Sequence, residues 1–105
     1  MGKLVRTKLT WLTKQEGGRN SMIPIGVRYC PTLIMDNLER SFEQEADVRW
    51  SADMHNLEVL TPEESIATLS YLVPEAPHHF LEPGNSFKLY EGDKLVACGV
   101  ILETD

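Results

Sequence analysis

The fold is indicated most clearly by Ser65-Ile66-Ala67-Thr68-Leu69-Ser70-Tyr71-Leu72-Val73, the cleanest alternating segment of the sequence. A period of two is typical of a β-strand, because successive side chains of a strand point to opposite faces. We therefore expect this strand to cross the core, with Tyr71 buried. Residues 5–12 show the same period, which sets Val5, Thr7, Leu9 and Trp11 against Arg6, Lys8, Thr10 and Leu12.

Strands account for most of the remaining sequence. Four more are expected, and they are residues 27–35, a short strand around Val48-Arg49-Trp50, residues 86–90 and residues 95–102. Pro31 places the first of these at a sheet edge or at a bulge, because proline has no N–H to donate. Closing six antiparallel strands into a small barrel removes the exposed edges of an open sheet. We therefore predict an all-β protein, a single closed antiparallel six-stranded β-barrel that spans residues 1–105.

Residues 36–46 do not fit this pattern. Leu38 and Phe42 lie four positions apart with acidic residues between them, a spacing that suits a short helix on the barrel rim. We expect a loop or a short helix here, since isolated helices of this length are marginal. A long acidic connection between strands is the alternative.

Length and composition indicate one small globular domain. The chain has 105 residues, of which 42% are hydrophobic and 25% charged, values that suit a single domain with a modest core. No apolar run approaches the roughly 20 residues that a membrane helix needs. The start, Met1-Gly2-Lys3-Leu4-Val5-Arg6, lacks the apolar region of a signal peptide. We expect a cytoplasmic protein with no membrane partner.

The two cysteines are expected to have structural roles. Two cysteines in a sequence of this kind do not form a disulfide framework. Cys98 lies between Ala97 and Gly99 in an apolar strand, where a small buried side chain packs well. Cys30 precedes Pro31 at the start of a strand, and no neighbouring histidine marks it as reactive.

Charge is distributed unevenly along the chain. The net charge is −6, but residues 1–35 carry six bases against one acid, whereas residues 36–64 carry nine acids against two bases. One interpretation is that this dipolar distribution steers a charged partner onto one face. The other is that basic and acidic strands face each other across the barrel, where opposite charges on neighbouring strands attract.

Five motifs occur in an order that points to a known family. They are Thr13-Lys14-Gln15-Glu16-Gly17-Gly18-Arg19, Tyr29-Cys30-Pro31, Leu81-Glu82-Pro83-Gly84, Phe87-Lys88-Leu89-Tyr90-Glu91-Gly92 and Val96-Ala97-Cys98-Gly99-Val100-Ile101. In this order the sequence resembles the third, C-terminal β-barrel domain of elongation factor Tu over nearly its whole length. The resemblance implies the same barrel fold.

The first of these motifs is expected to form a structural loop at Gly17, Gly18 and Arg19. Glycine adopts positive φ angles at little cost, so we expect both glycines to supply them. The guanidinium of Arg19 can donate several hydrogen bonds to carbonyls and hold the loop in shape.

The motifs of catalysis are missing from the sequence. It has neither the Gly-x-x-x-x-Gly-Lys-Ser/Thr phosphate loop nor the guanine-reading Asn-Lys-x-Asp motif, so we expect no GTP binding. The histidines are His55, His78 and His79, and without a nearby third ligand they do not indicate a metal site. No nucleophile elbow or positioned triad is recognisable. We predict a protein that is not an enzyme and has no catalytic residue, metal or cofactor.

Two classes of partner stay open. In the family this domain docks on its neighbouring domains and on the nucleotide-exchange factor, and it also contacts transfer RNA. The resemblance therefore implies a protein partner or a folded RNA. We expect a protein, because the acidic segment 36–64 would repel a polyanion. RNA binding through the basic N-terminal face is the alternative, and for either partner the candidate contact residues are Lys14, Arg19 and Arg28.

The sequence departs from the family at residues that serve contacts there. Where the family has Tyr-Arg-Pro-Gln, this chain has Tyr29-Cys30-Pro31-Thr32, and Asn20 replaces the histidine that follows Gly-Gly-Arg. The core motifs persist while these residues have changed. This pattern favours a fold that was kept and an original docking that was lost.

Overall fold

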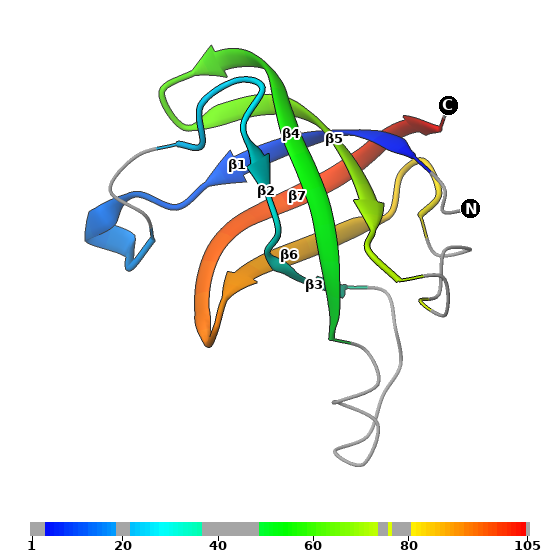
Figure 1. The fold of residues 1–105 in the computed structure, drawn as a ribbon. Coiled ribbons are helices and arrows are strands. Elements are labelled where there is room, and N and C mark those ends of the chain that lie inside the picture. Colours follow the sequence, from blue (N-terminus) through cyan, green and yellow to red (C-terminus); the bar gives the residue numbers. More distant parts are fainter. Residues whose placement is uncertain (1–3, 19–21, 37–48, 74–75, 77–80, 105) are drawn as a thin grey trace.

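The computed structural model describes residues 4–18, 22–36, 49–73, 76 and 81–104. Within these residues the chain is all-β apart from one short 3₁₀ helix (Figure 1). The elements are β1 (Val5–Trp11), η1 (Lys14–Glu16), β2 (Arg28–Tyr29), β3 (Thr32–Met35), β4 (Trp50–Thr61), β5 (Glu64–Tyr71), β6 (Ser86–Glu91) and β7 (Lys94–Thr104). The helix or loop expected in segment 36–46 falls almost wholly outside the described residues, as do Arg19 and the pair His78-His79.

Six of the strands close into an antiparallel barrel. The order around its wall is β4, β3, β6, β7, β1 and β5, and the pairing of β5 with β4 closes the ring. The closing pair is long, since its register runs from Ala52 opposite Tyr71 to Thr61 opposite Glu64. The predicted all-β class and the closed six-stranded barrel are confirmed, with β2 as one additional strand (Figure 1).

The additional strand results from an interruption at Cys30-Pro31. β2 and β3 pair with the same edge of β4 and in the same register, so one continues the other. Pro31 has no N–H to donate, but its carbonyl accepts a hydrogen bond of 2.9 Å from the N–H of Ala52. The strand expected over residues 27–35 is therefore present in two pieces, β2 at the end of the sheet order and β3 within the sheet. Pro31 lies at the break between them, and the register shows no bulge there.

β4 is much longer than the sequence predicted. The short strand expected around Val48-Arg49-Trp50 is a strand of 12 residues that begins at Trp50, so this prediction was wrong in extent and position. Its buried residues are Ala52, Met54 and Asn56. Alanine is small and asparagine is polar, so these buried positions do not produce a recognisable apolar stripe in the sequence. Two register shifts near the end of β4 break the period further.

The alternating strands fill the barrel interior. The side chains of Val5, Thr7, Leu9 and Trp11 are buried on β1, and every second residue of β5 is buried up to Tyr71. Both predicted patterns are confirmed. Phe87 is the largest fully buried side chain, and a Cβ added to Gly99 would lie 2.4 Å from its ring. Glycine at position 99 therefore makes room for the phenylalanine.

Two tight turns join the hairpins of the barrel. Gly92 is the first residue of the turn between β6 and β7 and has a φ of 62°, which is where a type II′ turn takes glycine. The turn between β4 and β5 is Pro62-Glu63, and neither of its residues has a positive φ. Such a turn matches the twist of its strands poorly. The register shift of β4 next to it relieves the mismatch.

Thr13 organises the loop that follows β1. Its hydroxyl accepts a hydrogen bond from the N–H of Glu16 (3.3 Å), and the Glu16 carboxylate accepts one from the N–H of Thr13 (2.8 Å), which is a capping box. These hydrogen bonds hold the pKa of Glu16 below its ordinary value. The carbonyl of Thr13 also accepts a hydrogen bond of 2.8 Å from the N–H of Gly18.

The two glycines of this loop have different roles. Gly17 ends η1 with a φ of 89°, as expected. Gly18 has no positive φ, so the expectation was wrong there. A Cβ on Gly18 would instead lie 2.2 Å from the carbonyl oxygen of Leu12. Glycine is needed at position 18 because two segments of backbone approach each other closely.

This close approach generates a stability prediction. Gly18→Val should lower the free energy of unfolding by about 2 kcal/mol or more, because the new side chain forces the loop away from Leu12. Gly17→Asn is the matched control, since asparagine tolerates positive φ and should change stability by about 0.5 kcal/mol or less. Urea denaturation of both variants measures the difference. A Gly18→Val protein as stable as the parent would contradict the close approach.

Candidate interaction surface

A chain of buried polar groups crosses three strands of the barrel. Trp11 on β1 donates from Nε1 to Oγ of Ser65 on β5 (2.9 Å), and the Ser65 hydroxyl donates to Oδ1 of Asn56 on β4 (2.7 Å). The Nδ2 group of Asn56 then donates to the carbonyl of Ile23 (2.7 Å). Asn56 and Ser65 are fully buried, so they depend on these partners in place of water. We call this series of hydrogen bonds the buried polar chain.

Asn56 holds the segment before β2 at three points. Its side chain donates to the Ile23 carbonyl, and its own carbonyl accepts a hydrogen bond of 3.2 Å from the N–H of Gly26. An isolated bridge also pairs Asn56 with Ile25. Ile23 is buried, whereas Ile25 is 58% exposed. The buried polar chain thereby keeps Ile25 at the surface beside β4.

After Asn56, one edge of β4 has no strand beside it among the residues that the structure describes. β3 and β2 pair with this edge as far as His55, while β5 pairs with the opposite edge as far as Thr61. β4 continues past β2 toward its turn with β5 (Figure 1). Among the described residues, none pairs with residues 57–61 on the side that β2 leaves. A strand edge of this kind is a template for another strand.

Large apolar side chains are exposed along the same edge. They belong to the segment before β2 and to the end of β4, and their exposed fractions lie between 43% and 58%. The five side chains are Ile25, Val27, Leu57, Val59 and Leu60. They make up most of the nine exposed large hydrophobic side chains in the part of the chain that the structure describes. We call them the apolar rim.

Two β-bulges bring the end of β4 to the surface. Leu57 and Leu60 are the extra residues at the two register shifts of the β4–β5 pairing. An extra residue at a bulge has no cross-strand partner, and it bends the strand. All residues of β4 after Asn56 are exposed, so the barrel covers neither face of this strand end.

The sequence analysis did not identify this surface. The available signal was Leu57-Glu58-Val59-Leu60, which places three apolar residues within four positions just before Pro62. One buried face of a strand accepts only every second residue. A surplus of apolar residues before a turn therefore indicates exposure of some of them, but it does not show which.

The predicted contact residues Lys14 and Arg28 are not brought together. Lys14 is exposed on η1, and Arg28 lies on β2 beside β4. Arg28 donates from Nε to Oδ1 of Asp53 (3.1 Å), and this hydrogen bond raises the pKa of Arg28 above its already high value. Arg19, the third predicted contact residue, lies outside the described residues. Of the predicted contact residues that the structure describes, Lys14 is exposed and Arg28 already has an acidic partner.

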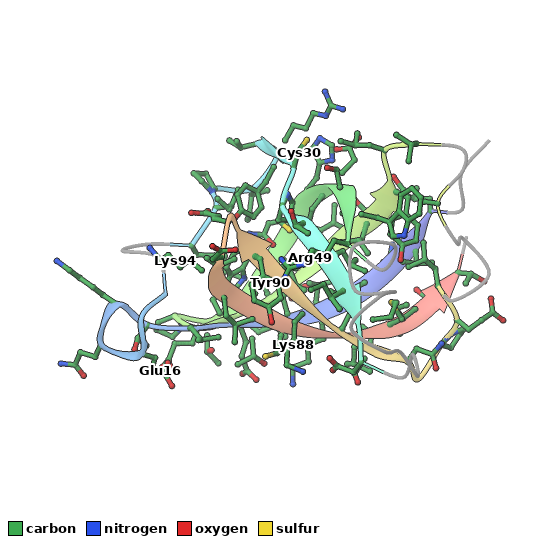
Figure 2. The ribbon with its side chains drawn as sticks, turned by 90° about the horizontal axis from the view of Figure 1, so that it is seen from below. Glu16, Cys30, Arg49, Lys88, Tyr90 and Lys94 are labelled. Carbon is green, nitrogen blue, oxygen red and sulfur yellow. The ribbon has the colours of Figure 1, made fainter. Side chains whose placement is uncertain are left out.

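Bases and acids form ion pairs across the outer face of the barrel. The pairs are Arg6–Glu103 (3.1 Å), Lys8–Glu64 (3.3 Å), Arg28–Asp53 (3.1 Å) and Lys88–Asp36 (2.6 Å). Figure 2 shows Lys88 pointing away from the barrel, and the hydrogen bond to Asp36 raises its pKa. Exposed pairs contribute little stability individually. Their arrangement agrees with the interpretation that opposite charges face each other on neighbouring strands.

A shallow hollow of about 300 Å³ lies on the outer face between β1 and β7. It is lined by Lys8, Thr10, Cys98, Gly99 and Val100. Cys98 is half-buried at this surface, so the expectation of a buried core thiol was wrong. Its neighbours Ala97 and Gly99 contact the interior, which turns Cys98 outward. Lys8, the charged residue of the hollow, already pairs with Glu64, so the hollow has little with which to bind a ligand.

The described residues contain no group of three or more histidine, cysteine, aspartate and glutamate side chains that could hold a metal ion. His55 lies on β4 with its Nδ1 3.9 Å from Asp53. Cys30 is an exposed free thiol at the interruption between β2 and β3 (Figure 2). In this same part of the chain no helix is both long and apolar enough to cross a membrane.

No known protein-family model matches the sequence, and no curated protein matches it. Within the described residues, the structure establishes a closed six-stranded β-barrel, a strand edge on β4 that no other strand covers, and the apolar rim beside it.

The buried polar chain predicts a large effect of one small substitution. Ser65→Ala should lower the free energy of unfolding by about 1–3 kcal/mol, because it leaves Nε1–H of Trp11 and Oδ1 of Asn56 buried without their hydrogen-bond partner. Ser70→Ala is the matched control, as it makes the same change on the half-buried outer face of β5. Thermal or urea unfolding compares the two variants. Equal losses of stability in the two variants would show that the buried polar chain makes no specific contribution to the free energy of unfolding.

Proposed function

We propose that this chain is a noncatalytic protein-binding barrel whose contact surface is the apolar rim. The observation that carries the proposal is the position of the rim along the free edge of β4. Grouped exposed apolar side chains mark interaction surfaces on soluble proteins. A free β-edge is usually shortened, charged, bulged or covered when a protein has no use for it. This edge carries two bulges and Glu58, yet Leu57, Val59 and Leu60 remain exposed along it.

The free energy available from burying the rim indicates that a partner must do more than cover it. Complete burial of one such side chain contributes about 1.5–3 kcal/mol, and each rim side chain already has roughly half of its surface buried. Covering the five of them would thus contribute several kcal/mol. Loss of translational and rotational freedom on association costs about 4–15 kcal/mol. A stable complex therefore needs contacts beyond the rim, and the unpaired backbone of β4 is beside it.

We also propose that the barrel is similar to the third domain of elongation factor Tu. The support is the order of the sequence motifs and a closed six-stranded barrel in which they occupy loops and strands of the expected kind. In that family the domain works by docking on other proteins. The function proposed for this chain is of the same class, with a contact surface formed by its own exposed residues and without a cofactor.

Transfer RNA or another folded RNA is the second candidate partner. It rests on the excess of basic residues in the first third of the sequence. Phosphate binding requires lysine and arginine side chains that are free to release counterions. The ion pairs of Arg6, Lys8 and Arg28 with acids reduce the positive charge that this face presents, so the structure favours the protein partner.

A comparison of captured proteins tests the proposed function. We expect the wild-type chain to retain specific proteins from a lysate of its source cells, and the double variant Leu57→Asp/Val59→Asp to lose them by about tenfold or more, as removal of interface anchors typically does. Leu4→Asp/Leu102→Asp is the matched control, because these side chains are equally exposed but lie at the other end of β1. Quantitative mass spectrometry measures the ratios.

Two outcomes would contradict the proposal. The first is capture of the same proteins in the same amounts by all three chains. The second is submicromolar binding of transfer RNA at an ionic strength of about 0.15 M, where contacts between distant exposed charges are screened. Folding of each variant is checked by its unfolding curve before the comparison.

A further inference from the structure

We propose that the free edge of β4 accepts an extended segment of a partner protein as an added antiparallel or parallel strand, and that apolar and basic side chains alternate in this segment. The inference rests on the proposed function and specifies its partner. It follows from the backbone of residues 57–61, from the apolar rim and from the charges beside them.

The first step concerns the backbone. Within residues 57–61, Glu58, Val59 and Thr61 pair with β5 through one edge, and among the described residues nothing pairs with the other edge. At about 3.3 Å per residue, this edge is about 16 Å long, which is the length of an ordinary strand. Strand addition satisfies the N–H and C=O groups of such an edge, and pockets or patches beside it select the side chains of the added strand.

The second step concerns the apolar side chains. Leu57, Val59 and Leu60 lie on the free strand, and Ile25 and Val27 flank the point where β2 stops pairing with it. A strand that continued β2 along this edge of β4 would therefore lie beside the rim side chains. In an added strand successive side chains lie on opposite faces, so every second side chain shares the face of Val59 and the others share the face of Glu58. An alternating segment presents its apolar side chains on the face of Val59 and the others on the face of Glu58.

The third step concerns charge. Glu58 and Glu63 are exposed, and neither forms an ion pair within the described residues. Two cations on the neighbouring strands, Lys8 of β1 and Arg28 of β2, are already paired with Glu64 and Asp53. The surroundings of the free edge are thus negative. Lysine or arginine in the added segment would complement this charge.

Charge also argues against a second copy of this chain as the occupant. Antiparallel pairing of two β4 edges centred on Val59 would place the two Glu58 side chains at diagonal positions, roughly 7–8 Å apart on one face. Each copy would also bring the net charge of −6 to the interface. A basic segment from another protein meets neither difficulty.

Synthetic peptides test the inference directly. The probe is a capped peptide of roughly seven residues in which valine and lysine alternate, a length that matches one strand. It is titrated into the ¹⁵N-labelled full chain and followed by NMR. We expect saturable shifts of the amides of residues 57–61 with a Kd of about 1 mM or below, together with slower hydrogen exchange of those amides.

Three altered peptides, two of them methylated, separate backbone pairing from apolar and electrostatic attraction. Methylation of every second backbone nitrogen, prepared in both phases, keeps the side chains and removes donors, so at least one phase should bind about tenfold more weakly or worse. A valine–glutamate peptide keeps the apolar side chains and reverses the charge, and it should also lose about tenfold or more. Equal binding of both methylated peptides and the parent would overturn strand addition. Equal binding of the lysine and glutamate peptides would overturn the charge selection.

Variants of the protein test whether Glu58 and Glu63 select the charge of the added strand. Glu58→Lys/Glu63→Lys should exchange the preference, so that the glutamate peptide binds better than the lysine peptide. Asp93→Lys/Glu103→Lys makes the same change in net charge away from the rim and should keep the wild-type preference. An unchanged preference in the first variant, or a dimer of the wild-type chain in sedimentation experiments that excludes the peptide, would overturn the proposal.

The peptide titration and the capture experiment fail independently. If no peptide binds at concentrations up to about 1 mM, the strand-addition proposal is wrong. The proposed protein-binding function still stands in that case if the Leu57→Asp/Val59→Asp variant loses captured proteins. If the captured proteins are unaffected by that variant, the rim is not the contact surface, whatever the peptides do.

Discussion

The buried hydrogen bonds from Trp11 through Ser65 and Asn56 to Ile23 are the constraint on which the rest of the structure depends. They lie where β1, β5 and β4 meet, which is where the sheet closes into a barrel. A buried amide and a buried hydroxyl are costly unless they find partners. A shift of β4 or β5 by one residue would turn these groups to the other face and leave their partners unsatisfied. Apolar packing favours closure in general, and the polar groups select the register in which it occurs.

The same interaction decides where the closed wall ends. Asn56 is the last residue of β4 with neighbours on both edges, and it anchors the segment that carries Ile25. Beyond it the strand continues through two bulges with exposed apolar side chains, and no other described residue pairs with its second edge. A surface of this kind, held by a rigid barrel, needs little ordering when a partner binds. The position of the apolar rim is therefore a consequence of how the barrel closes.

The parts of the fold that follow from local periodicity could be predicted from sequence. β1 and β5 have one apolar and one polar face, and the break at Pro31 follows from the missing N–H. β4 could not be delimited, because its buried positions include Asn56 and its bulges disturb the period. Gly18 illustrates a different limit, since the need for glycine there arises from the carbonyl of Leu12, which only the folded loop brings close.

The candidate surface depends even more on tertiary structure. The predicted contact residues were chosen by charge, and Arg28 proves to have Asp53 beside it. The apolar rim joins two segments about 30 positions apart in sequence, and their proximity results from the register of β2 on β4. No local pattern encodes that proximity. The surplus of apolar residues before Pro62 was the one signal that the sequence offered.

The central claim is that Asn56 fixes both the closure of the barrel and the surface beside it, and solvent exchange measured by NMR tests it most directly. The account predicts that the Nδ2 protons of Asn56 exchange slowly and show contacts to Ile23, while backbone amides on the free edge of residues 57–61 exchange rapidly. Asn56 side-chain protons that exchange as fast as those of an unfolded peptide would contradict it. Slow exchange along the whole free edge would contradict it as well.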